Sequence, residues 1–267
     1  MTELIQPDKN SLRELLGPHL TGSGELLFCT DFDGTLVNFT GVPSETELPE
    51  ETGNRLKRLA TLENLHLAVI SGRGFEELEE LVSLENVTLA GNHGLKIRFR
   101  DGRTRKPETS EQIKETIQKI NSETQEAFES LPGIIIENKG FGLALHYRQY
   151  EGEEEAVKEK FYEIWNRHAI QLLEVIQGAK LVEIRPKKWN KGDAVDLLRR
   201  ELNNPLTIYV GDDTTDEDAF EVLKKLKNGI PILVAEAENS ETAARYRLEN
   251  PAAVNEFLSA LYGYLAR

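Results

Sequence analysis

The stretch T-D-F-D-G-T-L-V occupies residues 30–37 and directly follows the apolar run L-L-F-C at residues 26–29. Asp31 and Asp33 are two residues apart where a buried strand ends in a Gly-Thr turn, so both side chains can reach one pocket. Two buried carboxylates are costly unless a cation neutralises them. A hard divalent ion with oxygen ligands does so, and beside phosphate this ion is usually Mg2+. The stretch therefore predicts a carboxylate nucleophile that attacks phosphorus while a metal ion holds the target.

The composition is that of an ordinary soluble globular chain with room for two domains. The chain has 267 residues, of which 39% are hydrophobic and 29% are charged, and its formal net charge is −14. Because nucleic-acid binding needs a basic surface, we expect no nucleic-acid partner. The sequence has neither an apolar stretch of about 20 residues nor a secretory signal, so we expect no membrane partner. Cys29 is the single cysteine, which excludes an intrachain disulfide and favours a cytoplasmic protein. We also expect the protein to be a monomer.

Apolar strands alternate with predicted helices in the first and last thirds of the chain. Short apolar strands separated by helices are typical of a parallel, doubly wound sheet that is buried on both faces. The sequence therefore predicts an α/β core with a Rossmann-like sheet. Near the start, Ser11 and Glu14 have the spacing of a capping box, which predicts that a short helix begins there. The predicted core strands are residues 26–30, 65–70, 87–90, 206–210 and 230–235, and the predicted core helices are residues 49–62, 75–84, 191–202, 216–226 and 251–265.

The middle of the chain has a different pattern. Its strands alternate apolar and polar residues, as in an antiparallel sheet with one buried face. The turn Asn138-Lys139-Gly140 joins two of these strands in a predicted hairpin. We therefore predict a catalytic core of residues 1–100 and 186–267, interrupted by an inserted α+β cap at residues 101–185. The predicted cap strands are residues 134–137, 141–148, 171–176 and 181–184, and its helices are residues 110–131 and 151–168.

Four polar clusters follow predicted core strands or open a core helix. Open α/β sheets bind ligands at the carboxyl ends of their strands, and phosphoryl transfer depends on positioning and on neutralising the charge of the phosphoryl oxygens. The first cluster is not a calcium loop, because that loop needs an acid or Asn at position 35 and Gly at position 36, where the chain has Thr35 and Leu36. The four clusters are Asp31 with Asp33, Ser71-Gly72-Arg73, Lys191, and the run at residues 211–216 that contains Asp212, Asp213 and Asp216.

On these residues the chain resembles the haloacid dehalogenase-type phosphatases, which are marked by D-x-D-G-T, a later Ser or Thr, a Lys, and a paired acid after a strand. The resemblance implies that Asp31 is the nucleophile and forms an aspartyl-phosphate. It implies that Asp33 is first the general acid for the leaving sugar oxygen and then the general base for water. It implies that Ser71 and Lys191 bind the phosphoryl oxygens. It also implies Mg2+ bound by the Asp31 carboxylate, the Asp33 main-chain carbonyl and Asp212, with Asp213 and Asp216 supporting these ligands.

Within that superfamily, further stretches resemble the trehalose-6-phosphate phosphatases. They are G-N-H-G at residues 91–94, E-N-K-G at 137–140, H-Y-R at 146–148, V-E-I-R-P at 182–186, N-K-G at 190–192 and G-D-D-T-T-D-E-D at 211–218. This resemblance covers roughly residues 25–260 and implies a phosphorylated disaccharide substrate, trehalose 6-phosphate. It implies that Lys139, Lys180 and Glu183 of the cap hold the glucose hydroxyls, with Arg73 and His93 at the boundary between core and cap. The family often has an acid at the position of Lys96.

Three alternatives stay open at this point. The protein is a different sugar-phosphate phosphatase of the same superfamily, acting on sucrose 6-phosphate or mannosyl-3-phosphoglycerate, if a substrate panel favours one of those compounds. It is a phosphomutase if it needs an activating bisphosphate and releases no phosphate. It is a catalytically dead sugar-phosphate sensor if it binds the compound without turnover.

Overall fold

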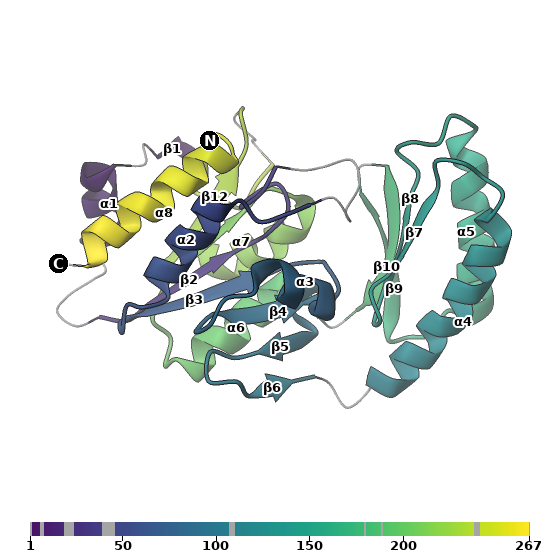
Figure 1. Cartoon of the computed structure of the whole chain (residues 1–267), viewed down its shortest axis with the longest axis horizontal. Helices are drawn as coiled ribbons and strands as arrows, with labels where there is room; N and C mark the ends of the chain where they lie inside the picture. The colour runs from purple at the N-terminus through teal and green to yellow at the C-terminus, as the bar shows by residue number, and fades with distance from the viewer. Residues whose placement is uncertain are drawn as a thin grey trace.

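The computed structural model of the chain has two parts, one built on a nine-stranded sheet and the other on a four-stranded sheet (Figure 1). It describes residues 2–5, 8–18, 24–38, 46–106, 110–178, 180–187, 189–237 and 241–266. None of the helices in these ranges combines the length and the apolar character that crossing a membrane requires. The predicted fold class, an α/β core with an α+β cap, is confirmed.

The larger sheet is parallel except at one edge. Its strand order is β1-β13-β12-β11-β2-β3-β4-β5-β6, and only the β4–β5 and β5–β6 pairs are antiparallel. The central strands β2 and β11 are buried along their whole length, which explains their unbroken apolar sequence. The strands are β1 Glu3–Leu4, β2 Leu26–Thr30, β3 Leu65–Ile70, β4 Thr88–Gly91, β5 Lys96–Arg98, β6 Thr104–Arg105, β11 Leu206–Gly211, β12 Gly229–Val234 and β13 Tyr246–Leu248.

Helices cover both faces of this sheet (Figure 1). Side chains along β2 alternate between two hydrophobic clusters: Leu26 and Phe28 belong to the first, and Leu27 and Cys29 belong to the second. Helices α1, α2, α3 and α8 contribute to the first cluster, and α6 and α7 contribute to the second. The helices are α1 Lys9–Leu16, α2 Glu50–Leu59, α3 Phe75–Val82, α6 Lys191–Glu201, α7 Glu217–Lys224 and α8 Pro251–Leu265, and two 3-10 turns are η2 Asn92–Gly94 and η3 Thr214–Asp216.

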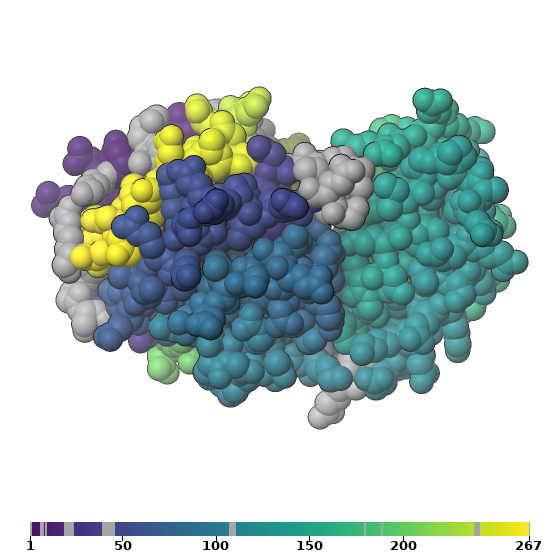
Figure 2. All heavy atoms as spheres, viewed as in Figure 1, coloured from purple at the N-terminus to yellow at the C-terminus, as the bar shows by residue number. Residues whose placement is uncertain are grey.

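The cap is a separate antiparallel layer with its own core. Its strand order is β7-β8-β10-β9, and helices α4 and α5 lie on the face away from the larger sheet (Figure 1). Figure 2 shows the cap as a distinct lobe that abuts the core. The cap strands and helices are α4 Ser110–Phe128, β7 Ile135–Asn138, β8 Leu143–His146, α5 Glu154–His168, β9 Leu173–Gly178 and β10 Leu181–Pro186.

The structure differs from the sequence-based expectations mainly in the short elements. The predicted capping box at Ser11 and Glu14 is wrong: α1 begins earlier, and Asp8 is its N-cap, accepting hydrogen bonds from the backbone N–H groups of Asn10 and Ser11 at 2.8 and 2.9 Å. The short strands β1 and β13 were not predicted, because such short strands carry little periodicity. The boundaries at residues 101 and 186 stay a prediction, and β6 pairs with β5 in the larger sheet.

Candidate active site

The candidate site lies at the carboxyl ends of the neighbouring strands β11, β2 and β3. A pocket of about 310 Å3 opens there, with walls from both the core and the cap. Because the strands are parallel and adjacent, residues that are far apart in the sequence meet at this edge. The walls include the predicted core residues Asp31, Asp33, Ser71, Arg73, His93, Lys191, Asp212 and Asp213, and the predicted cap residues Lys139 and Glu183.

Lys191 is the electrostatic centre of the site. Its side chain is 2% exposed, and its ammonium group lies 2.8 Å from Asp31 Oδ1 and 2.7 Å from Asp216 Oδ1. Burial by itself would lower the pKa of Lys191, but the two carboxylates outweigh burial and raise it. A capping box between Asn190 and Asp193 begins α6 at this residue, where a cation is unfavourable to the helix dipole. The carboxylates, not the helix, therefore stabilise the charge of Lys191.

The acidic residues around Lys191 form a group suited to a hard divalent ion. Oxygen atoms of Asp31, Asp212 and Asp216 all lie within 4.8 Å of one another. Burial raises the pKa of Asp31, opposed by Lys191 and reinforced by Asp216 and Asp212, and burial with Asp216 raises the pKa of Asp212 to about 7. Three carboxylates against one ammonium leave negative charge that a cation would neutralise, and oxygen donors are the ligands that Mg2+ prefers.

Asp216 already has all the partners that it needs. Its oxygens accept hydrogen bonds from Lys191 Nζ, from the Tyr209 hydroxyl at 2.6 Å, and from the backbone N–H groups of Asp212 and Asp213 at 3.0 Å each. It therefore suits the predicted supporting role, whereas Asp31 and Asp212 have oxygens to offer an ion. Asp213 is exposed and caps η3.

Gly34 explains how the β2 turn and the Asp212 loop approach so closely. Its φ is +76°, and a Cβ at this position would lie 2.0 Å from Asp212 Oδ2. The next residue, Thr35, donates its hydroxyl to Asp212 Oδ1 at 3.1 Å. The glycine of D-x-D-G-T therefore serves two purposes: it permits a left-handed turn, and it leaves room for the acid that arrives from β11.

Asp33 is held by Arg73 in a two-pronged ion pair. Arg73 Nε and Nη2 donate to the two carboxylate oxygens of Asp33 at 2.7 Å each, and Arg73 Nη1 also bonds Glu77. Burial would lower the pKa of Arg73, but Asp33 and Glu77 raise it. The predicted sugar contact Arg73 thus lies at the pocket with its guanidinium bound to Asp33. The buried Ser71 lines the same pocket, and its hydroxyl accepts the backbone N–H of Arg73 at 3.2 Å.

A second buried cluster joins the core to the cap. Glu183 of β10 accepts hydrogen bonds from Lys139 Nζ at 2.9 Å and lies 3.2 Å from His93 Nε2 of the core. Burial alone would raise the pKa of Glu183, but Lys139 and His93 hold it well below its usual range. Burial lowers the pKa of His93. In addition, Asn92 donates its side-chain amide to the Lys139 carbonyl at 2.5 Å, so η2 contacts the hairpin turn directly.

The cap wall also contains Glu137, His146 and Arg148, which sequence reasoning did not include among the site residues. Glu137 and His146 contact each other at 2.9 Å across β7 and β8. The sequence held them only as parts of the stretches at residues 137–140 and 146–148, and the strand register brings them together, since Ala144 is paired with both Glu137 and Glu183. Polar residues of three strands thus share the cap face that meets the core.

Lys180 does not join the pocket. Its side chain is about half exposed, and its ammonium group pairs with Glu154 at the start of α5. The turn between β9 and β10 directs it away from the residues that surround Glu183. The sugar contact that the resemblance implies for Lys180 stays a prediction, since Lys180 is not among the residues that line the pocket in this arrangement.

Comparisons with known proteins agree with this arrangement. Residues 29–252 match the trehalose-phosphatase family. A trehalose 6-phosphate phosphatase of Zea mays is 33% identical over 257 residues, covering 89% of this chain and 70% of that protein. A trehalose-phosphate phosphatase of Arabidopsis thaliana is 30% identical, covering 89% of this chain and 66% of that protein. The C-terminal domain of a trehalose-6-phosphate phosphatase from C. albicans has the same fold, with a TM-score of 0.79, 24% identity, and coverage of 98% of this chain and 99% of that chain.

The family match spans most of the chain and includes the residues that meet at the carboxyl ends of β2, β3 and β11. The fold is that of haloacid dehalogenase-like hydrolases. We conclude that the chain belongs to the trehalose-phosphatase family and is a phosphoric monoester hydrolase.

Proposed function

We propose that the protein hydrolyses trehalose 6-phosphate to trehalose and phosphate, with Asp31 as the nucleophile. The observation that carries this proposal is that Asp31 and Lys191 of the buried Asp31–Lys191–Asp216 ion-pair group line the same pocket as the Glu183–Lys139–His93 cluster. The first group suits a phosphoryl centre, and the second offers donors and acceptors suited to sugar hydroxyls. The family's relatives act on the same compound by name.

Asp31 forms and breaks the covalent bond in this proposal. One carboxylate oxygen attacks phosphorus, the bond from phosphorus to the sugar oxygen breaks, and an aspartyl-phosphate results. Lys191 and Ser71 bind the phosphoryl oxygens, whose charge must be neutralised in the transition state. Bound Mg2+, with Asp31, Asp212 and the Asp33 main-chain carbonyl as ligands, would add positive charge at these oxygens and orient them. The same ion would favour the ionised form of Asp31.

Asp33 moves the protons. It gives a proton to the leaving sugar oxygen, and it later takes one from the water that attacks the aspartyl-phosphate, a role that typically contributes about 10^2–10^4-fold. Arg73 holds both oxygens of its carboxylate, so that ion pair must open at least partly before Asp33 reaches the sugar oxygen. Substrate binding against Arg73 is a direct way to open it.

The cap supplies the sugar side of the pocket. Glu183 and Glu137 offer acceptors and Lys139 a donor, and each is buried enough for its hydrogen bonds to discriminate between hydroxyl patterns. Because Glu183 contacts His93 of the core, this wall forms only when cap and core meet. Closure would also exclude bulk water from the aspartyl-phosphate.

A phosphate-release assay tests this function. We expect trehalose 6-phosphate with Mg2+ to be preferred over sucrose 6-phosphate and mannosyl-3-phosphoglycerate, and chelation of Mg2+ to stop the reaction. Asp31→Asn should release phosphate at least about 10^3-fold more slowly, because an amide cannot take the nucleophile's place. Preference for another sugar phosphate would refute the substrate, and normal turnover by Asp31→Asn would refute the nucleophile.

A further inference from the structure

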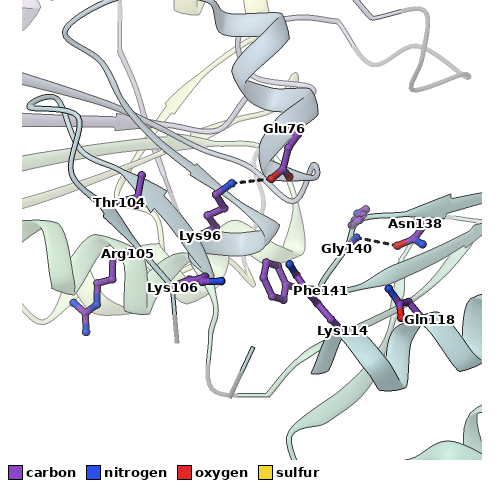
Figure 3. A pocket seen from close by; sticks show the side chains of 11 residues that line it. Glu76, Lys96, Thr104, Arg105, Lys106, Lys114, Gln118, Asn138, Gly140 and Phe141 are labelled. Atoms are coloured by element: carbon purple, nitrogen blue, oxygen red, sulfur yellow. Dashed lines mark hydrogen bonds and ion pairs between the residues drawn. The ribbon is translucent and has the colours of Figure 1, made fainter. Parts of the chain in front are cut away.

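A second cavity, of about 570 Å3, lies behind the hairpin turn that borders the candidate active site. It shares Lys139 with the first pocket, but the ammonium group of that lysine bonds Glu183 on the active-site side. Figure 3 shows its walls. Glu76 of α3, Lys96 of β5 and Lys106 come from one side, and Lys114 and Gln118 of α4 with Phe141 come from the cap. The cavity is therefore a joint between core and cap.

The charge of this cavity is opposite to that of the chain. Lys96, Arg105, Lys106 and Lys114 face a single carboxylate, Glu76, among its lining residues, although the chain carries a net charge of −14. Figure 3 shows Lys96, Lys106 and Lys114 around the Phe141 ring, while Arg105 points away from the centre. A concentration of ammonium groups in a hollow of an acidic protein creates a local positive potential.

These ammonium groups are poorly neutralised by the protein. Lys114 has no ion pair among the described residues, and its Nζ lies 5.0 Å from the centroid of Phe141. Lys106 has only a loose pair with Glu111 at 3.7 Å, and both side chains are exposed. Lys96 is shared between Glu76 at 2.7 Å and the Phe75 ring at 4.1 Å. Rings partly replace carboxylates here, and a ring stabilises an ammonium group less than an anion does.

We propose that this cavity binds a small multivalent oxyanion of the pyrophosphate or phosphate-ester class. Lys96, Lys106 and Lys114 bind its oxygens, and the Gln118 amide supplies a further donor. The volume is in the range of small-molecule sites. The position of Lys96 supports the assignment, because Lys96 lines this cavity and is not among the residues that line the active-site pocket.

An anion bound between Lys96 of β5 and Lys114 of α4 would bridge core and cap. It would favour the arrangement seen here, in which the hairpin turn contacts Asn92 through the Lys139 carbonyl and Lys139 Nζ contacts Glu183. By linkage, an anion at this joint and a sugar phosphate at the active site then strengthen each other's binding by the same factor. This coupling rests on the proposed function, whereas anion binding itself does not.

The test is calorimetric titration with inorganic pyrophosphate at low ionic strength in the presence of EDTA. EDTA removes divalent ions, so pyrophosphate cannot bind through a metal at Asp31 and Asp212, and those carboxylates repel it. We expect saturable 1:1 binding to the unaltered protein. The double variant Lys106→Gln/Lys114→Gln should bind at least about tenfold more weakly, because two charge-assisted contacts are lost.

A matched control keeps the net charge of the double variant. Lys119→Gln/Lys227→Gln removes two exposed lysines outside the cavity and should bind pyrophosphate like the unaltered protein. Lys114→Arg, which keeps the charge, should also bind. Absence of saturable binding, or equal affinity of the Lys106→Gln/Lys114→Gln variant and the unaltered protein, would overturn the site. If binding depends on these lysines but the protein releases no phosphate from trehalose 6-phosphate, the site stands and the proposed function fails.

Discussion

Replacing Lys191 by Met should destabilise the protein in a strongly pH-dependent way. The ammonium group serves two buried carboxylates at 2.8 and 2.7 Å, and the lysine side chain is 2% exposed. Removing one partner of a buried ion pair typically costs about 3–5 kcal/mol. Since both Asp31 and Asp216 lose their partner, we expect a loss of about 4–5 kcal/mol in the free energy of unfolding at pH 8.

The sign of the pH dependence follows from linkage. Without Lys191, the pKa of Asp31 rises further, because burial and the repulsion from Asp216 and Asp212 are no longer opposed by the ammonium group. A carboxyl group whose folded pKa is raised destabilises the fold above that pKa, and the penalty disappears as the pH falls towards the unfolded pKa of about 3.9. The loss caused by Lys191→Met should therefore be smaller at pH 5 than at pH 8.

Urea unfolding in EDTA, at both pH values, measures this loss. Lys227→Met is the control, because Lys227 is exposed and surface substitutions usually change stability by no more than about 0.5 kcal/mol. A loss below about 1 kcal/mol at pH 8, or the same loss at both pH values, would show that Lys191 is not the partner that stabilises the buried acids.

Gly34→Ala should abolish phosphate release, because the new Cβ would meet the Asp212 carboxylate at 2.0 Å. Gly102→Ala is the control, because Gly102 also has a positive φ but a Cβ there would meet no atom within 4 Å; equal activity of the two variants would contradict this reasoning. Glu183→Gln should raise KM for trehalose 6-phosphate at least about tenfold, while turnover of the small substrate p-nitrophenyl phosphate changes little. Glu154→Gln, outside the pocket, is the control, and an equal effect of the two substitutions on KM would place Glu183 outside the sugar site. Burial lowers the pKa of His93, so as the pH falls the unfolded chain binds a proton at this histidine before the folded protein does. The free energy of unfolding should therefore decrease as the pH drops through the unfolded pKa of about 6.5. In His93→Gln the denaturation midpoint should depend less on pH between pH 7 and pH 5, and an unchanged pH dependence would disprove the assignment.

Much of the fold follows from local patterns. The continuous apolar strands β2, β3 and β11 were predictable because a parallel sheet buries both faces, and their order along the chain placed Asp31 and Ser71 at one sheet edge. The same logic predicted a position for Lys191 at the start of α6, as the structure has it. The short strands β1 and β13 were not predicted because two or three residues carry too little pattern.

Pairs of residues that meet only through tertiary contacts were harder to predict from the sequence. The capping role of Asp8 was missed because Ser11 and Glu14 offered a competing pattern three residues further on. The ion pair between Asp33 and Arg73 joins residues 40 positions apart, and sequence alone assigned them to different tasks. Lys180 lies in a turn with its φ at +65° and is not among the residues that line the pocket, so its contact with the sugar stays a prediction. Placing Glu137 and His146 at the site required the cross-strand register of the cap sheet.

The most direct test of the central claim is rapid-quench peptide mapping of the protein during turnover of trehalose 6-phosphate with Mg2+. Our account predicts a phosphoryl group on the peptide that contains Asp31, formed and lost at rates consistent with turnover and absent in Asp31→Asn. Phosphate release without any phosphorylated protein, or a phosphoryl group on another residue, would contradict it.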